Sequence, residues 1–257
     1  MKMKKILIAI LGVVTIACVV FGSLWHFGAF GNKHSTWNLS WPFFEKSLAG
    51  DFSNSQLLPQ NITELYVDAS IANVTVQVGS ANSVEMKWSH DVLEPIVSVD
   101  GSVVRITQTD KHVHLAGRTE CKIIISIAPQ LSLVNIFTDV GNISMTNVGA
   151  LECTASCDVG NINLTGGNSG NLLVTSDTGN VRVEGVTFNT CSAKSDVGNV
   201  RVELPSSVNA ADYSLSLKTD VGNIHAFGQS YKHSFTRSSA GNKFINAESD
   251  VGNIRVE

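Results

Sequence analysis

The sequence predicts an all-β protein: a single-stranded parallel β-solenoid (β-helix) with coils of about 19 residues, preceded by one N-terminal transmembrane helix. Three observations support this prediction. A short motif, Asp-Val-Gly-Asn-Ile or a close variant, recurs at near-constant spacing. Residues on both sides of the motif alternate between apolar and polar. The chain begins with lysines followed by a long uncharged apolar segment.

The motif begins at six aspartates, and the first four are evenly spaced along the chain. The six are Asp139, Asp158, Asp177, Asp196, Asp220 and Asp250. A fixed short period is typical of solenoids, whose units stack because no unit can bury its own apolar face. The last two intervals, which end at Asp220 and Asp250, are longer and are expected to hold loops inserted at one corner.

The residues around the motif predict a strand on each side of it. Aligned on the aspartate, alternate columns are apolar or small, as at Val134 and Ile136 before the motif and Ile143 and Met145 after it. This period of two places one strand face inward. Each unit is then strand, Asp-Val-Gly-Asn corner, strand and a second corner, and the repeats cover residues 134–257.

The corner residues fit this geometry. Glycine at the third position tolerates backbone angles that other residues avoid, and asparagine side chains can form a ladder from coil to coil. The expected ladder consists of Asn142, Asn161, Asn180, Asn199, Asn223 and Asn253. The alternative is an antiparallel meander or propeller with Gly-Asn as a hairpin turn. A propeller blade needs about 40 residues, so the short period favours the solenoid.

Residues 1–30 are predicted to be a membrane anchor. Residues 6–25 are mostly apolar and uncharged, and as a helix they would span about 30 Å, the thickness of a bilayer core. The preceding lysines predict a single pass with a cytoplasmic N-terminus and an extracytoplasmic remainder. A cleaved signal peptide, or a lipoprotein signal that uses Cys18, stays an alternative, and either would also export the domain.

The rest of the chain divides into a linker, residues 31–60, and a solenoid domain, residues 61–257. Aromatic residues of the linker would either rest on the membrane or pack on the first strands. The domain begins with short β-branched segments that lack the motif but read as strands. They are Glu64–Val67, Val74–Val78, Val84–Trp88, Ile96–Val99, Val103–Thr107 and Lys122–Ile127.

Charge and cysteine spacing exclude two classes of interaction. The formal net charge is −4, which argues against nucleic acid because its binding requires a basic face. Cys153 and Cys191 share an apolar column with Leu172 between them. Two coil steps separate them by about 9.6 Å, which exceeds the Cα distance of about 7 Å that a disulfide tolerates. We expect buried free thiols.

The aspartate column is a candidate metal site. Asp139, Asp158, Asp177 and Asp196 would form a row of like charges, and Ca²⁺ prefers carboxylate and carbonyl oxygens. Alternatively, each aspartate binds the amides of its own turn. No other cofactor is expected.

A charged strip beyond the turn is a candidate partner surface. Its residues are Arg182, Glu184, Arg201, Glu203, His225 and Arg255. Such a strip could contact an anionic cell-wall polymer or an envelope protein. Alternatively, it is a solvated face with cross-strand ion pairs.

These features resemble the bacterial putative-adhesin β-strand-repeat family, a domain of unknown function that includes LiaG-like anchored proteins. The resemblance covers about residues 60–257 and rests on the anchor, the Ile127-Ala128-Pro129 step and the Ser/Thr-Asp-x-Gly-Asn-Ile/Val units. It implies an extracytoplasmic β-solenoid with no assigned catalytic residues. We therefore expect no enzymatic activity, but a membrane-anchored binding or scaffolding module of the cell envelope, with a part in envelope-stress response. The alternatives are a surface adhesin that recognises glycan or host and, less favoured, a carbohydrate-active enzyme.

Overall fold

The computed structural model describes residues 48–108, 119–128 and 130–257. The predicted anchor, residues 1–30, and the first part of the predicted linker, residues 31–47, lie outside the described residues. Within the described part, no helix has the length and apolar character to cross a membrane.

Most of the described residues form strands, and two connections contain a short 3-10 helix, η1 Asp91–Leu93 and η2 Ala210–Asp212. The strands before the first full repeat are β1 Ala49–Leu57, β2 Glu64–Ile71, β3 Asn73–Val78, β4 Ser83–His90, β5 Ile96–Asp100, β6 Val103–Thr107 and β7 Cys121–Ile127. The repeats follow as β8 Gln130–Val140, β9 Ile143–Thr146, β10 Gly149–Val159, β11 Ile162–Thr165, β12 Asn168–Thr178, β13 Val181–Glu184, β14 Thr187–Val197, β15 Val200–Glu203, β16 Tyr213–Ala226, β17 Gln229–Arg237, β18 Lys243–Val251 and β19 Ile254–Val256. The six strands predicted before the repeats are confirmed.

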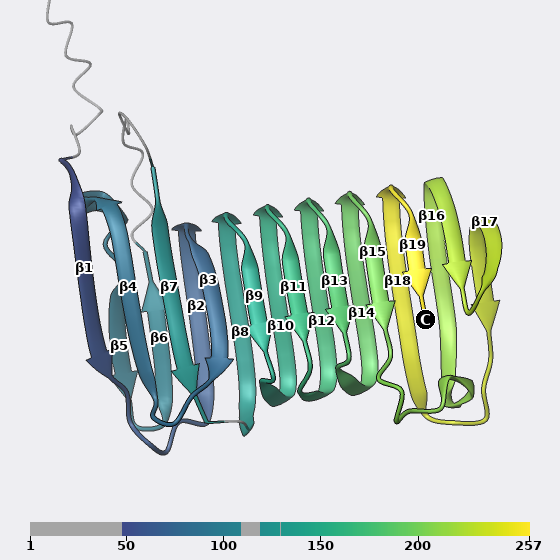
Figure 1. Cartoon of the computed structure of the whole chain (residues 1–257), viewed down its shortest axis with the longest axis horizontal. Coiled ribbons are helices and arrows are strands. Elements are labelled where there is room, and N and C mark those ends of the chain that lie inside the picture. Colours follow the sequence, from purple (N-terminus) through teal and green to yellow (C-terminus); the bar gives the residue numbers. More distant parts are fainter. Residues whose placement is uncertain (1–47, 109–118, 129) are drawn as a thin grey trace, which may run out of the picture. The chain divides into compact units, whose positions relative to one another are not determined.

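Each regular coil consists of one long strand and one short strand that meet at the Asp-Val-Gly-Asn corner (Figure 1). The long strand β10 pairs in parallel with β8 and β12, so that Cys153 lies between Val134 and Leu172. The short strands β9, β11, β13 and β15 pair in the same parallel way. The all-β parallel solenoid is confirmed, and the antiparallel meander is excluded.

The coils at the C-terminal end are not stacked in chain order. Strand β14 pairs with β18, and β18 pairs in turn with β16. The last coil of the chain, β18 and β19, therefore lies between the coil of β14 and β15 and the coil formed by β16 (Figure 1). The expectation that the longest interval holds only a corner loop was wrong, because this interval contains β17.

The other end of the row shows a similar exchange. Strand β2 pairs in parallel with both β6 and β8, and β3 pairs with both β7 and β9. The later segments β6 and β7 therefore lie outside the earlier β2 and β3. The chain then returns to continue the row with β8.

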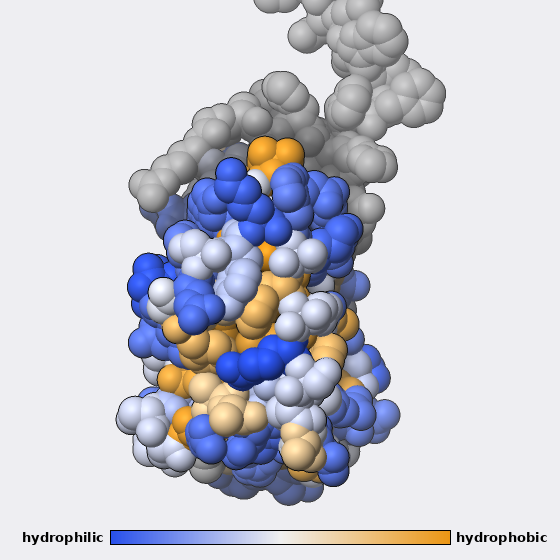
Figure 2. All heavy atoms as spheres, turned by 90° about the vertical axis from the view of Figure 1, so that its right-hand side faces the viewer, coloured by the Kyte–Doolittle hydropathy of each residue, from blue (hydrophilic) through white to orange (hydrophobic). Residues whose placement is uncertain are grey.

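Antiparallel strands cover both ends of the row. At one end β5 pairs with β6, β4 pairs with β7, and β1 pairs with β4. The predicted linker therefore ends too late, because residues 49–57 form β1. At the other end β17 pairs with β16, and hydrophobic and hydrophilic residues are mixed on the surface that faces outward there (Figure 2). Tyr231 stacks on Phe235 at this end, with ring centroids 4.1 Å apart.

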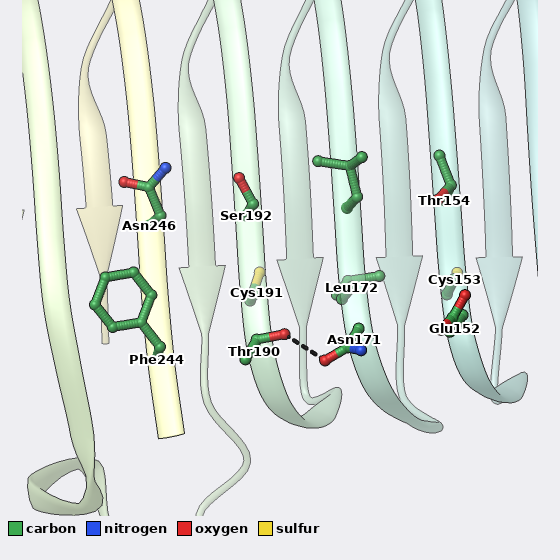
Figure 3. A pocket seen from close by; sticks show the side chains of 11 residues that line it. Glu152, Cys153, Thr154, Asn171, Leu172, Thr190, Cys191, Ser192, Phe244 and Asn246 are labelled. Carbon is green, nitrogen blue, oxygen red and sulfur yellow. Dashed lines mark hydrogen bonds between the residues drawn. The ribbon is translucent and has the colours of Figure 1, made fainter. Parts of the chain in front are cut away.

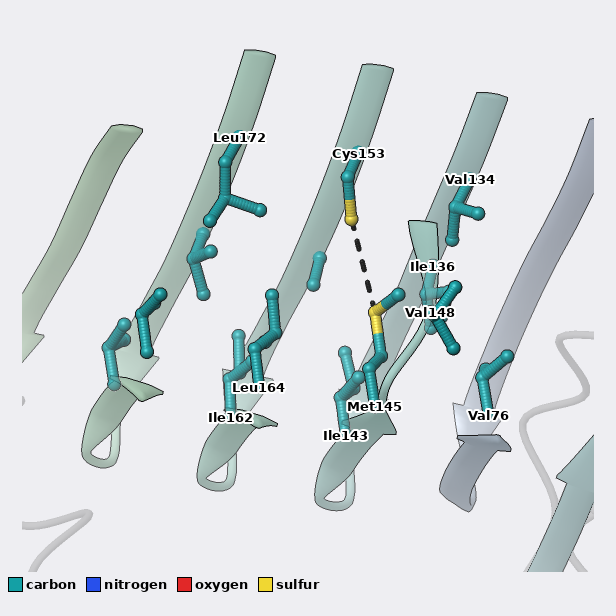
Figure 4. Close-up of a cluster of buried hydrophobic side chains, with 14 of the residues drawn as sticks. Val76, Val134, Ile136, Ile143, Met145, Val148, Cys153, Ile162, Leu164 and Leu172 are labelled. Atoms are coloured by element: carbon teal, nitrogen blue, oxygen red, sulfur yellow. Dashed lines mark hydrogen bonds between the residues drawn. The ribbon is translucent and has the colours of Figure 1, made fainter. Parts of the chain in front are cut away.

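The core lies between the long and the short strands and consists of the inward columns of every coil (Figure 4). Cys153 is buried beside Met145, with the two sulfur atoms 3.9 Å apart. The four described cysteines are all buried and free, as predicted for Cys153 and Cys191. Burial raises the pKa of both of these thiols to about 12.

Candidate binding groove

The glycine column lets neighbouring corners approach closely. A Cβ added to Gly160 would lie 1.9 Å from the carbonyl oxygen of Gly141, and one added to Gly179 would lie 1.8 Å from that of Gly160. No side chain fits at such a distance. The same restriction applies to Gly198, Gly222 and Gly252.

The residue before each aspartate supports the same corner from inside. Ser195 is fully buried, and its Oγ donates to the carbonyl oxygen of Gly179 at 2.7 Å. Ser249 donates in the same way to Gly198, and Thr219 donates to Gly252, both at 2.8 Å. The sequence showed this column only as small residues, and its hydroxyls now explain how the glycine carbonyls are satisfied.

The asparagine column forms the predicted ladder, with one additional member. Oδ1 of Asn180 accepts from the backbone N–H of Asn199 and from its Nδ2, both at 3.0 Å. Asn180 in turn donates from both groups to Oδ1 of Asn161. The ladder begins at Asn73, whose Oδ1 accepts two bonds from Asn142.

This bonding pattern leaves a surface that offers hydrogen-bond donors. An asparagine amide has two acceptor lone pairs and two N–H donors. In Asn161, Asn180 and Asn199 the oxygen accepts two bonds and Nδ2 makes one. Each of these amides therefore has one N–H left for solvent or a ligand.

A row of basic side chains, which consists of three arginines and His225, runs beside the ladder, two residues further along each coil. Arg182 is the register partner of Arg201, which is the partner of Arg255, and Arg255 is the partner of His225. The strip predicted from the sequence is therefore brought together. Its order differs from the chain order, because Arg255 lies between Arg201 and His225.

Three carboxylates lie on the far side of this row. Nε of Arg182 is 3.2 Å from Oε1 of Glu184, and Nη2 of Arg201 is 2.7 Å from Oε2 of Glu203. Arg255 pairs with Glu257, and their hydrogen bond raises the pKa of Arg255 and lowers that of Glu257. These are exposed or half-exposed pairs, which contribute little stability.

The ladder and the basic row line a groove of about 800 Å³. Its walls are asparagine side chains, three arginines and His225, and its base includes Val181 and Val200. No Asp or Glu is among the described residues that line it. The groove lining therefore offers guanidinium and amide N–H donors, a combination that favours an acceptor-rich, anionic ligand, while the glutamates paired with the arginines lie outside the lining.

The arginines are not needed to build the coil. The same column holds Ser144 in β9 and Asn163 in β11, and these coils have the same paired geometry. Glutamates of the same and neighbouring strands offset the repulsion between these arginines, because Nε of Arg201 is 3.7 Å from Oε1 of Glu184 and its Nη2 is 3.6 Å from Oε2 of Glu257. The coil geometry therefore does not require arginine in this column, and the row is available to a ligand as well as to these ion pairs.

The aspartates of the row are not gathered into a cluster of metal ligands in the part of the chain that the structure covers. Asp158 and Asp177 are exposed, and Asp139 and Asp196 are half-buried. Asp196 pairs with Lys194 of its own strand at 2.8 Å. Across the described ranges, no group of three or more His, Cys, Asp or Glu residues could hold a metal ion. The calcium site stays a prediction without structural support.

Sequence reasoning missed three parts of the site. Asn73 is the last residue of Ser70-Ile71-Ala72-Asn73, which is a degenerate copy of Asp-Val-Gly-Asn. The Asn73-Val74 pair could have indicated this copy. Asn163 and Glu257 extend the two rows and follow from the aligned columns. The segment Ser239-Ala240-Gly241-Asn242 also resembles the corner motif and follows Asp220 at the regular repeat interval, but it lies just before β18 and forms no coil of its own.

The sequence profile of the Toastrack DUF4097 family matches residues 62–203, more than half of the chain. The chain belongs to this family. The search of curated proteins found no match.

Solved structures include similar but distant chains. A putative cell adhesion protein from Clostridium sporogenes is 16% identical, with a TM-score of 0.48, over 80% of this chain and 99% of that one. A putative adhesin from Bacteroides fragilis is 12% identical, with a TM-score of 0.47, over 81% and 97%. A putative lipid binding protein from Parabacteroides distasonis is 9% identical, with a TM-score of 0.30, over 82% and 96%.

Proposed function

We propose that this protein is a non-catalytic binding module that holds an extended anionic polymer of the bacterial cell envelope in the groove between its asparagine ladder and its arginine row. The observation that carries the proposal is the groove lining, which combines three arginines and a row of amide N–H groups without a carboxylate among the described residues. Phosphate and carboxylate groups accept such bonds well.

The repeat geometry favours a polymer over a small anion. Neighbouring coils are about 4.8 Å apart, so the same donors recur at short regular steps. The ladder contacts extend from Asn73 to Asn223, across seven stacked coils. A chain with regularly spaced anionic groups could bind several coils at once and gain affinity from each.

The proposal places the module outside the cytoplasm, held in the cell membrane by the single-pass anchor predicted at residues 1–30. The envelope polymer is then within reach of the domain, and an envelope protein is the other expected partner. A part in an envelope-stress response belongs to the same proposal. The surface-adhesin alternative would use the groove for a glycan of another cell, and a carbohydrate-active enzyme would require a pair of catalytic carboxylates that the groove lining does not supply.

Co-sedimentation of the full-length protein with isolated bacterial walls tests this function. Wild type should pellet with intact walls and much less with walls stripped of phosphate-bearing polymers. Arg182→Gln with Arg201→Gln should reduce pelleting by about tenfold, and added salt should weaken the wild-type interaction.

A matched control uses two neighbouring basic residues outside the groove. Lys87 and Lys122 are register partners on β4 and β7. Lys87→Gln with Lys122→Gln removes the same charge and should leave pelleting unchanged. Equal pelleting with intact and stripped walls, or equal loss in both double variants, would contradict the proposal.

A further inference from the structure

The outer face of the long strands has a second depression, separate from the groove over the corners and short strands. Its volume is about 530 Å³, and it lies over β10, β12, β14 and β18 (Figure 3). We refer to it as the trough. Its outward-facing lining residues are Glu152, Thr154, Asn171, Leu173, Thr190, Ser192, Phe244 and Asn246.

Strand register gives the trough a floor and two walls. The floor is Thr190 and Ser192 on β14. Asn171 and Leu173 on β12 are the register partners of these residues on one side, and Phe244 and Asn246 on β18 are their partners on the other side. Each wall therefore has one amide and one apolar side chain, in opposite order.

The two apolar side chains are exposed without a packing role. Phe244 is 41% exposed and Leu173 is 45% exposed, both on strands in the middle of the sheet. A central strand does not require an aromatic residue on its solvent face, because the core columns lie on the opposite face. Solvent-facing apolar side chains beside polar ones are typical of ligand sites.

The polar side chains can both donate and accept. Hydroxyl and amide groups have this dual character, and only Glu152 among the lining residues is charged. Thr190 Oγ1 donates to Asn171 Oδ1 at 2.8 Å, which fixes that amide with its N–H groups available (Figure 3). Sugar hydroxyls have the same dual character, whereas an anionic polymer needs donors and positive charge.

The width of the trough fits one flat ring. Strands β12 and β18 are separated by β14, so their axes are about 9.6 Å apart. A flat ring whose two faces each lie about 4 Å from a wall side chain needs a separation of about 8 Å between the walls. A peptide could not bind here by strand addition, because β12, β14 and β18 are already paired on both edges.

We propose that the trough binds an uncharged oligosaccharide, with pyranose rings resting against Phe244 and Leu173 and ring hydroxyls bonded to Asn171, Thr190, Ser192 and Asn246. This site is independent of the anionic-polymer groove and lies on a different face. The protein would then contact two chemically different envelope components at once.

Isothermal titration of the full-length protein with chitohexaose and with cellohexaose tests the site. At least one of these neutral sugars should bind, and Phe244→Ala should weaken binding by about tenfold, the effect expected from the loss of a ring contact. Asn246→Ala provides a second variant that leaves the aromatic ring in place, and it should also weaken binding. Leu151→Ala is the control, because Leu151 is 62% exposed on β10 and is not among the residues that line the trough.

The two sites can be distinguished in the same set of proteins. Arg182→Gln with Arg201→Gln should bind the sugar normally, and Phe244→Ala should keep the wild-type difference in pelleting between intact walls and walls stripped of phosphate-bearing polymers. No binding of either sugar at millimolar concentration would overturn the trough proposal. Urea denaturation should first show that Phe244→Ala and Asn246→Ala unfold at the same urea concentration as the wild-type protein. If these folded variants then bound the sugar as tightly as the wild-type protein, the trough proposal would also be overturned.

Discussion

Asn253 donates its backbone N–H to Oδ1 of Asn199 at 2.9 Å, although 54 residues separate them in the chain. Asn223, which lies between them in sequence, is displaced by one coil and donates to Oδ1 of Asn253 at 3.0 Å. The ladder is therefore continuous in space but not in sequence.

Removal of one ladder amide should destabilise the whole row. In Asn180→Ala, the backbone N–H and Nδ2 of Asn199 lose their acceptor, and the hydrogen bond from Nδ2 of residue 180 to Oδ1 of Asn161 is lost. Because the ladder is partly exposed to water, we expect a loss of about 1–2 kcal/mol in the free energy of unfolding, measured by urea denaturation. Asn163→Ala, an asparagine outside the ladder on β11, should cost less than about 0.5 kcal/mol. Equal losses would show that the ladder adds no stability.

The glycine corners should reject any side chain. Gly179→Ala would place Cβ 1.8 Å from the carbonyl oxygen of Gly160, so the coils must separate. We expect a loss of about 3 kcal/mol or more. Gly185 also has a positive φ, of 64°, but no atom lies within 4 Å of its added Cβ. Gly185→Ala should therefore cost only about 1–2 kcal/mol from backbone strain. Identical denaturation midpoints for the two variants would refute the close-approach explanation.

One substitution in the hydroxyl column should stabilise the protein. Ser176, Ser195 and Ser249 each donate to the glycine carbonyl of the neighbouring coil, but Cys157 has its sulfur 3.2 Å from the carbonyl of its own Gly160. A hydroxyl at this position could reach the Gly141 carbonyl of the neighbouring coil.

Cys157→Ser should therefore raise the free energy of unfolding by about 0.5–1.5 kcal/mol. The reciprocal change, Ser176→Cys, should lower it by a similar amount. Calorimetric melting of both variants provides the comparison. A destabilised Cys157→Ser protein would show that the thiol is preferred there for its packing.

The buried thiols should make the fold sensitive to alkaline pH. Burial raises the pKa of Cys153 and Cys191 from 9.0 to about 12. The folded state therefore keeps protons that the unfolded state releases above pH 9. Stability from this source is complete below pH 9 and declines as the pH rises towards 12.

Urea midpoints at about pH 8 and about pH 10.5 measure this decline. Wild type should lose more stability between them than Cys153→Ala with Cys191→Ala, because other titrating groups are common to both proteins. Parallel losses in the two proteins would argue against thiol ionisation as the cause.

Local chemistry explains why so much of the coil was predictable. The Asp-Val-Gly-Asn corner, the asparagine ladder and the Cys153–Leu172–Cys191 column depend on residues that recur at one spacing and face the same environment in every coil. Alternation of apolar and polar residues, as in β13 and β15, determines which face is buried. These features do not depend on which coil is the neighbour.

Coil order could not be read from the same columns. Asn199 accepts from Asn253 with the same geometry that it would offer to Asn223, because all corners are alike. The choice depends on β17, whose pairing with β16 makes the coil of β16 the outermost one. Long-range pairing of this kind has no local sequence signal. The trough was missed for a related reason, since Phe244 and Leu173 come together only through this order.

Hydrogen–deuterium exchange of the full-length protein, with and without a solubilised phosphate-bearing wall polymer, tests the central claim most directly. Bound polymer should slow exchange of the corner and short-strand amides from Asn180 to Glu184, from Asn199 to Glu203 and from Asn253 to Val256. The long strands β10, β12 and β14 should be unaffected. Protection confined to those long strands, or no change in either region at saturating polymer, would contradict the account.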